Sequence, residues 1–194
     1  MTVLKRDTDY HTYSDYLTWS RDYGDELIDG DAYVRESPSP SQSHQQIVVE
    51  LCRQAANALE DQPCDVYVAP LDLRFAKSAE EDDLVDTVVQ PDVLIVSDLK
   101  KVDARGVRGA PDWVAEVLSR STARHDQTVK LSAYERAGVR EVWLVDPVDR
   151  TLTVYLLEAG YYGRATVLEL KGRTQLTVVP GVTVDWARVL AKMS

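Results

Sequence analysis

Two apolar runs in the middle of the chain each carry one acidic residue, and this feature constrains the possible folds more than any other. Asp92 opens the apolar run 93–96, and Glu116 lies inside the run 113–118. Both runs have the composition of buried strands. A buried, unpaired carboxylate costs several kcal/mol even after the protein relaxes. Two neighbouring carboxylates also repel each other, so that one must take up a proton. The fold therefore has to supply positive charge at this place.

The alternation of the second run makes the burial of Glu116 specific. Alternate residues of a strand point to the same face, so Glu116 shares its face with Val114 and Leu118. The opposite face carries Trp113, Ala115 and Val117. Both faces are apolar, and a divalent cation would relieve the burial and the repulsion, because hard cations such as Mg²⁺ prefer carboxylate oxygen. We therefore predict a metal site at Asp92 and Glu116, with Lys130 as a cationic helper.

Length and composition indicate one globular domain. A chain of 194 residues can bury a proper core, and its 44% hydrophobic and 28% charged residues are close to the globular average. No apolar stretch is long enough to span a bilayer, and the polar residues 1–10 do not resemble a signal peptide. Cys52 and Cys64 are too few for a disulfide framework and lack zinc-site spacing, so we expect reduced thiols in a cytoplasmic protein.

The formal net charge of −10 argues against a broad nucleic-acid-binding surface, because phosphate contacts come from Lys and Arg. It leaves room for a local basic groove. The basic residues that could line such a groove are Lys100, Lys101, Arg105, Arg108, Arg120 and Arg124. The acidic run 80–83 is interpreted as a solvated hairpin tip or loop.

The first third of the chain predicts a short helix, a hairpin and one long helix. Thr12 has the character of an N-cap with Asp15 three residues on, so a helix is expected from here to Tyr23. Residues 26–31 predict a strand, an Asp-Gly turn and a second strand. Residues 43–59 carry apolar side chains at helical spacing and predict the clearest helix of the chain.

The rest of the chain predicts a mixed sheet with helices. A helix capped by Thr122 and followed by Gly138 lies between strands at 112–118 and 140–145, a spacing typical of a right-handed crossover. Further strands are predicted at residues 64–69, 71–76, 87–96, 151–157, 164–170 and 174–179, the last three as an antiparallel meander, with a connector over 100–111 and a C-terminal helix over 185–193. This order of elements indicates an α+β fold with an α/β-like core.

A series of short motifs runs in a fixed order along most of the chain. They are Glu26-Leu27-Ile28-Asp29-Gly30, His44-Gln45-Gln46-Ile47-Val48, Pro91-Asp92-Val93, Glu116-Val117-Leu118-Ser119, Ser121-Thr122, Asp126, Lys130, Tyr134, Gly138-Val139 and residues 141–147. The ordered set resembles the PD-(D/E)XK nuclease superfamily and, more narrowly, its Uma-type restriction endonucleases. Two positions depart from these patterns. The superfamily places a lysine at the position where this chain has Leu118, and the Uma-type pattern supplies that lysine from the following helix, where this chain has Lys130. The Uma-type family also often has Pro at the position where this chain has Arg120.

The resemblance implies a restriction endonuclease-like fold, in which a mixed β-sheet is flanked by helices. It implies one nuclease-like domain over residues 1–194. Within this domain, an N-terminal helix and hairpin would occupy about residues 10–42, the catalytic core about 43–147, and C-terminal strands with a short helix about 148–194.

The resemblance also implies hydrolysis of phosphodiester bonds with Mg²⁺, or Mn²⁺ as a substitute, and DNA as the substrate. Asp92, Glu116 and the main-chain carbonyl of Val117 would bind the metal. Lys130 would orient the attacking water or stabilise the developing negative charge. The assisting positions are Asp126, which would hold Lys130 from one helical turn away, Glu50 or Glu26 as an additional acid, and His44 as a phosphate contact or as a support of the helix entrance. The choice between Glu50 and Glu26 stays open.

Other interpretations of the same residues stand beside the nuclease. The acidic composition favours a catalytically inactive interaction module that keeps the nuclease fold as a homodimer, and a metal-dependent enzyme acting on another phosphoester is a third alternative. Ser119 and Ser121 do not indicate a serine hydrolase, because no Gly-x-Ser-x-Gly elbow surrounds them. Tyr134 is interpreted as a core or rim aromatic, because no basic residues interleave the aromatic ones. We expect a homodimer and no membrane association.

Overall fold

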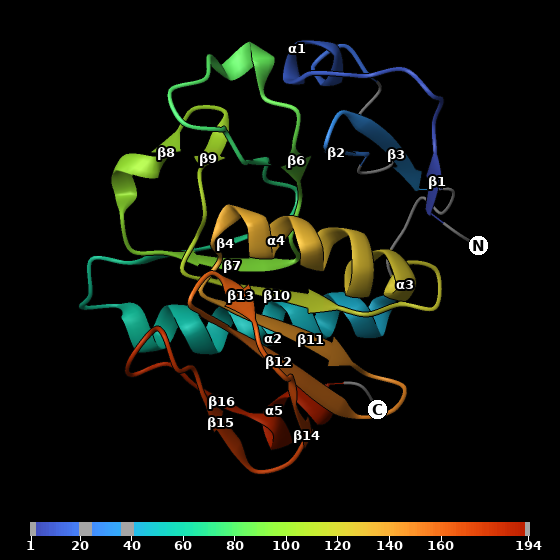
Figure 1. The fold of residues 1–194 in the computed structure, drawn as a ribbon. Coiled ribbons are helices and arrows are strands. Elements are labelled where there is room, and N and C mark those ends of the chain that lie inside the picture. The colour runs from blue at the N-terminus through green and yellow to red at the C-terminus, as the bar shows by residue number, and fades with distance from the viewer. Residues whose placement is uncertain (1–2, 20–24, 36–40, 193–194) are drawn as a thin grey trace.

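The computed structural model describes residues 3–19, 25–35 and 41–192 (Figure 1). Within these residues, the strands form two seven-stranded sheets and one two-stranded sheet. Helices pack on both faces of one of the seven-stranded sheets, so the predicted α+β fold class with a mixed sheet is confirmed.

The central sheet contains the segments that carry Asp92 and Glu116. Its strand order is β13-β12-β11-β10-β7-β4, with β14 paired to β12. The strands are β4 (Asp65–Val68), β7 (Val93–Val96), β10 (Trp113–Val117), β11 (Glu141–Asp146), β12 (Thr151–Glu158), β13 (Tyr161–Tyr162) and β14 (Thr166–Glu169). β10 runs parallel to β11, and the other paired strands of this sheet are antiparallel. β10 therefore lies inside the sheet, with partners on both edges.

A helical segment of three parts connects the parallel strands β10 and β11. α3 (Ala123–His125) continues into a π-helical turn, η3 (Asp126–Lys130), and then into α4 (Leu131–Ala137). The predicted strand–helix–strand unit is confirmed, and the helix begins at Ala123 with Thr122 in the N-cap position, although the Thr122 side chain makes no capping hydrogen bond. The Ser119 hydroxyl accepts the Thr122 N–H at 3.2 Å, two residues after β10 ends.

Helices cover both faces of the central sheet, as Figure 1 shows. On one face, α2 (Gln42–Leu59) and α5 (Trp186–Leu190) pack with the sheet into one hydrophobic core. On the other face, α4 and the second large sheet pack into another core. Trp113, Ala115 and Val117 of β10 belong to the α2 core, and Val114 with the following Leu118 belongs to the α4 core. The predicted alternation of this strand between two buried faces is confirmed.

The second large sheet has the strand order β1-β3-β2-β6-β5-β9-β8. Its strands are β1 (Val3–Lys5), β2 (Glu26–Ile28), β3 (Asp31–Arg35), β5 (Leu73–Arg74), β6 (Val88–Val89), β8 (Val102–Asp103) and β9 (Gly106–Arg108). The predicted N-terminal hairpin is present as β2–β3, and Asp29 and Gly30 have φ angles of 53° and 80°, as a type I′ turn requires. Ile28 of this hairpin packs into the α4 core, so the hairpin lies on the Glu116 face of the central sheet.

The predicted strand 87–96 is divided between the two large sheets. β6 belongs to the second sheet and β7 to the central sheet, with Pro91 between them. Pro91 has no N–H to contribute to a ladder, so the chain leaves one sheet and enters the other at this point. The predicted connector 100–111 was also wrong, because most of it forms the 3₁₀ turn η2 (Leu99–Lys101) and the β8–β9 hairpin.

The two ends of the chain are less regular than predicted. α1 (Tyr13–Tyr16) has four residues, and the Thr12 N–H binds the Asp15 carboxylate at 2.9 Å, as expected of this N-terminus. The helix was predicted to continue to Tyr23, but it ends at Tyr16, and Tyr23 itself lies outside the described residues. The C-terminal meander is interrupted, since the predicted strand 174–179 is reduced to β15 (Arg173–Gln175). This strand pairs with β16 (Thr183–Asp185), which was not predicted.

None of the described helices combines the length and the apolar character needed to cross a bilayer. Cys52 and Cys64 are both free thiols, as their number suggested.

Candidate active site

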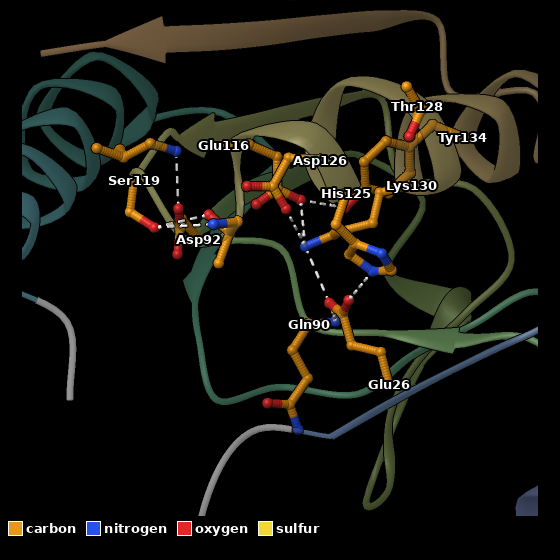
Figure 2. Close-up of polar contacts among 12 residues, drawn as sticks. Glu26, Gln90, Asp92, Glu116, Ser119, His125, Asp126, Thr128, Lys130 and Tyr134 are labelled. Atoms are coloured by element: carbon orange, nitrogen blue, oxygen red, sulfur yellow. Dashed lines mark hydrogen bonds and ion pairs between the residues drawn. The ribbon is translucent and has the colours of Figure 1, made fainter. Parts of the chain in front are cut away.

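The Lys130 side chain turns into the protein and meets several acidic groups (Figure 2). It is fully buried. Its ammonium nitrogen lies 2.7 Å from Glu116 Oε1 and 2.9 Å from Glu26 Oε1. Asp126 Oδ1 lies farther away, at 3.8 Å. These carboxylates come from β10, β2 and η3, so three separate parts of the chain meet at one ammonium group.

Asp92 directly precedes β7 and lies beside Glu116 in the sheet. β7 and β10 are antiparallel with Val93 opposite Ala115, and continuing this register by one residue places Asp92 opposite Glu116. Opposite residues of an antiparallel pair lie on the same face. Asp92 Oδ2 also accepts the Val117 main-chain N–H at 2.7 Å, which ties this carboxylate to the end of β10. The two carboxylates predicted to bind a metal are therefore neighbours.

His44 reaches the same place from the first turn of α2. Its Nε2 atom lies 3.2 Å from Asp92 Oδ1. The helix begins with Ser41 as its N-cap, whose hydroxyl accepts the His44 N–H at 3.2 Å. His44 is thus a partner of Asp92 at the helix entrance, and its contact with a phosphate stays a prediction.

The neighbouring carboxylates differ in their electrostatics. Burial raises the pKa of Glu116 to about 8, although the Lys130 ammonium lowers it. Further increases in this pKa come from Asp126, Asp92 and Glu26. Burial also raises the pKa of Asp92, but the hydrogen bond and charge of His44, the Lys130 charge and a main-chain N–H together hold it below its usual value. One acid of the pair is therefore ionised at neutral pH while the other favours its protonated form, as repulsion between them requires.

Tyr134 belongs to the site, and its interpretation as a core aromatic was incomplete. Its hydroxyl donates to Glu116 Oε1 from a fully buried position on α4. Burial, followed by the charges of Glu116 and Glu26, raises the pKa of Tyr134, so the phenol stays a hydrogen-bond donor. Lys130 and Tyr134 are four residues apart, a spacing that places both on one helix face. That spacing is the sequence signal that could have identified Tyr134.

Glu26 connects two further residues to the site. The His125 ring nitrogen Nε2 lies 2.9 Å from Glu26 Oε2, and the Gln90 main-chain N–H donates to Glu26 Oε1 at 3.3 Å. Sequence reasoning assigned a function to neither His125 nor Gln90. His125 directly precedes Asp126, one of the motif residues, and this position is a weak sequence signal that His125 lies near the site.

Glu50 is engaged elsewhere. From α2, its carboxylate accepts hydrogen bonds from Arg53 Nε at 2.9 Å and from Gln54 Nε2 at 3.1 Å. The Arg53 hydrogen bond holds the pKa of Glu50 below its usual value, against the effect of burial. Of the two acids that the sequence left open, Glu26 is therefore the one in contact with Lys130.

Two of the basic residues that could line a groove, Arg105 and Arg108, form ion pairs with the acidic run, part of which folds as the 3₁₀ turn η1 (Asp82–Leu84). These pairs are Arg105–Asp83 and Arg108–Asp82, and the buried Arg74 also pairs with Asp82. The acidic run is thus bound to the protein through Asp82 and Asp83, and its interpretation as a solvated loop was incomplete, although Glu81 and Asp83 are exposed. Arg120 and Arg124 are exposed on the segment between β10 and Lys130.

The donor chemistry of the site fits a hard divalent cation. Asp92 and Glu116 are two neighbouring carboxylates, and proteins usually hold Mg²⁺ through one or two carboxylates together with water. Burial and then the charges of Asp126, Asp92 and Glu26 raise the pKa of Glu116, although Lys130 lowers it, and a bound cation would favour the ionised carboxylate. Among residues 3–19, 25–35 and 41–192, no three His, Cys, Asp or Glu side chains converge closely enough to hold an ion. A cation would therefore need main-chain or water oxygens beside these two acids.

Comparison with known proteins agrees with this description. Residues 13–188 match the profile of the Uma2 family, described as "Putative restriction endonuclease". The structure is similar to the crystal structure of a putative nuclease belonging to DUF820 from Anabaena variabilis, with a TM-score of 0.73 and 18% identity, over 94% of this chain and 99% of that chain. A search of curated proteins gave no match. The structural likeness confirms the restriction endonuclease-like fold.

Proposed function

The chain belongs to the Uma2 family of putative restriction endonucleases, and we propose that it cleaves DNA by Mg²⁺-dependent hydrolysis of phosphodiester bonds. One observation carries the proposal. The buried Lys130 ammonium lies 2.7 Å from Glu116, and Glu116 lies opposite Asp92 in the register of β10 and β7. Phosphodiester hydrolysis needs oxygen ligands for a cation and a positive group for the developing charge. These three side chains supply both.

Asp92 and Glu116 would hold the cation, with the main-chain carbonyl of Val117 as a further ligand. Val117 directs its N–H to Asp92, and the N–H and C=O groups of a strand residue face the same neighbouring strand, so this carbonyl is expected on the Asp92 side. Bound Mg²⁺ supplies a water of lowered pKa and polarises the scissile phosphate.

Lys130 would stabilise the negative charge that develops on the phosphate. Its burial keeps water away from the ammonium, and an electrostatic contact acts more strongly in such an environment. Tyr134 donates to the same Glu116 oxygen that Lys130 contacts, and it would thereby fix the orientation of this carboxylate. Asp126, 3.8 Å from the ammonium, would support Lys130 from its own helix.

A plasmid assay tests the proposal. Supercoiled DNA is incubated with Mg²⁺ or Mn²⁺ and with wild type, Asp92→Asn, Glu116→Gln or Lys130→Met, three changes that keep the side-chain size. We expect nicked and linear DNA from wild type and none from these variants. Glu50→Gln is the matched control, since it neutralises a buried glutamate that binds Arg53 outside the cluster, and it should cleave like wild type. Cleavage that persists in all three site variants would exclude the proposed site. Single-stranded DNA and RNA in parallel reactions define the substrate.

A second function is favoured by the charge of the chain. The net charge is −10, and ion pairs with the acidic run neutralise Arg105 and Arg108, two of the residues that could contact phosphates. This favours an inactive, homodimeric interaction module. It predicts no cleavage of DNA or RNA and no Mn²⁺ binding by calorimetry. We expect a twofold dimer whichever of the two functions is correct. Metal binding and cleavage therefore distinguish the nuclease from the interaction module. Sedimentation tests only whether the protein is a dimer.

A further inference from the structure

We propose that Glu26 and His125 are positioning residues for Lys130, held in place by the β2–β3 hairpin and the π turn η3. Together they would fix the ammonium against Glu116, at the position from which it acts on the substrate. The inference rests on the proposed nuclease function, because it assigns a purpose to the position of Lys130.

Lys130 is held from two sides by different elements. Glu116 on β10 lies 2.7 Å from its ammonium, and Glu26 on β2 lies 2.9 Å away. A lysine side chain is long and flexible, and a single ionic contact leaves many rotamers open. The second carboxylate removes much of this freedom. Because it comes from the second large sheet, the N-terminal hairpin becomes part of the site.

Glu26 is in turn oriented by His125. The ring nitrogen lies 2.9 Å from Glu26 Oε2 and leaves Oε1 directed at Lys130. The His125 ring also packs on the Tyr33 ring, with centroids 4.8 Å apart. Tyr33 is opposite Glu26 in the β2–β3 ladder, and opposite residues share a face. The hairpin therefore presents a carboxylate and an aromatic ring to one imidazole.

The π turn explains how His125 and Lys130 can share one carboxylate. They are five residues apart, and in an α-helix of 3.6 residues per turn they would point roughly 140° away from each other. In a π turn, each hydrogen bond reaches the fifth residue, so residues five apart lie close together on the helix surface. η3 covers Asp126–Lys130, the whole interval after His125. Single π turns are frequent at functional sites.

The reactivity of Lys130 in the metal-free protein measures its position without any need for cleavage. Acetic anhydride labelling is followed at Lys130 and at the exposed Lys100 by mass spectrometry. We expect slow labelling of Lys130 in wild type. Glu26→Gln and His125→Phe should raise its rate about tenfold, since losing an anchor makes local opening easier. Unchanged labelling of Lys100 and an unchanged circular dichroism spectrum show that the variants are folded.

Conservative variants separate positioning from packing. His125→Gln replaces the imidazole with an amide N–H that can still donate to Glu26, so Lys130 should be labelled slowly, as in wild type. His125→Phe has no such donor. Glu50→Gln should label like wild type. In the cleavage assay, kcat should fall about 100-fold in Glu26→Gln and His125→Phe, the size of effect that a misplacement of about 1 Å produces, while KM for DNA stays near the wild-type value. His125→Gln should recover most of kcat.

Two results would overturn the inference. One is wild-type labelling of Lys130 in both Glu26→Gln and His125→Phe. The other is complete loss of Mn²⁺ binding in Glu26→Gln, measured by calorimetry without DNA, because Glu26 would then be a metal ligand. A third outcome separates the inference from the proposed function. If the wild type cleaves no nucleic acid but Lys130 is labelled faster in these variants, the positioning of Lys130 is supported and the proposed function is overturned.

Discussion

Two buried glutamates on the paired strands β10 and β11 have opposite environments. Glu116 is 1% exposed and Glu141 is 0% exposed. Glu116 faces the α4 core. Glu141 faces the α2 core, because it alternates with Val142, which packs on the α4 side. Burial alone therefore does not distinguish a functional acid from a structural one in this protein.

The hydrogen bonds that Glu141 accepts within the described residues come from neutral N–H groups. It accepts from Trp143 Nε1 at 2.6 Å and from the main-chain N–H groups of Thr177 and Val178 at 2.7 and 2.9 Å. Burial raises the pKa of Glu141, and these three donors, together with the charge of Arg140, oppose the rise. The carboxylate thereby fastens the C-terminal segment to β11. No ion is needed to complete this arrangement.

Glu116 instead shares one ammonium with other acids. Lys130 contacts Glu116 and Glu26, and Asp92 and Asp126 add negative charge close by. The cluster holds more negative charge than this ammonium balances. The comparison shows that the chemistry of the partners, rather than burial, marks the site where a cation would bind.

Lys130→Met should have the largest effect of the changes that test this contrast. It keeps the side-chain length but removes the ammonium, and breaking a buried ion pair costs about 3–5 kcal/mol. We expect the free energy of unfolding in chelator to fall by this amount at neutral pH. Mn²⁺ should restore part of it, since a ligand that binds the folded protein stabilises it. Denaturant titrations with and without Mn²⁺ measure both effects, and wild-type stability in chelator would contradict the charge balance described here.

Glu141→Gln should destabilise the protein whether or not metal is present. The amide has one oxygen, so either Trp143 or the N–H groups of Thr177 and Val178 lose their acceptor. An unsatisfied buried donor costs about 1–3 kcal/mol, and we expect a loss of about 2 kcal/mol. Thermal unfolding in chelator and in Mn²⁺ should give the same shift relative to wild type. If Mn²⁺ restored the stability of Glu141→Gln, Glu141 would belong to the metal site, and the two glutamates would not differ in function.

Glu116→Gln makes the same change at the other glutamate, but in chelator it should raise the stability of the protein where Glu141→Gln lowers it. It fixes the neutral state that Glu116 favours in the folded protein, and the amide oxygen can still accept from Tyr134 and Lys130. We expect the metal-free protein to gain on the order of 1 kcal/mol, because burial and the neighbouring carboxylates disfavour the ionised glutamate more than Lys130 favours it. Calorimetry should show no Mn²⁺ binding. An unchanged or lower melting temperature in chelator would contradict this prediction.

The pH dependence of this difference tests its cause. The pKa of Glu116 is about 8 in the folded protein and 4.5 ordinarily. A raised pKa contributes stability that is fully present below pH 4.5 and is lost as the pH rises through 8. The gain from Glu116→Gln should therefore be small near pH 5 and grow up to about pH 8. Denaturant titrations of both proteins in chelator across this range measure it, and a difference that shrinks with pH would exclude the raised pKa of Glu116 as the cause.

The Glu116 side of this contrast could be predicted because its signals are local. Strand alternation identified both buried faces of β10, and motif order identified Asp92 and Lys130. The Glu26–His125 contact could not be predicted, because it joins residues 99 positions apart and depends on a π turn that has no signature in composition. The split of one predicted strand at Pro91 is also a tertiary effect, since only the finished fold supplies two sheets for its two halves.

The role of Glu141 was equally hidden in the sequence. It appeared only as the first residue of a strand motif, and its main-chain donors lie in residues 177–178, which were predicted to be a strand of the meander. Those residues are not in a strand, so their N–H groups are available to Glu141. A contact between a side chain and an irregular segment leaves no periodic pattern from which it could be read.

Tyr134→Phe should have the smallest effect and sharpens the contrast most finely. It removes one hydroxyl hydrogen bond to Glu116, and the ring keeps its edge contact with Phe75 at a centroid distance of 6.1 Å. We expect a loss of about 1 kcal/mol in stability. Mn²⁺ affinity should fall about tenfold, since a residue that orients a metal ligand tunes its affinity. Calorimetry beside thermal unfolding separates the two effects. If stability falls and Mn²⁺ affinity does not, the phenol is a partner like those of Glu141, and the two glutamates would differ only in Lys130 and its surrounding acids.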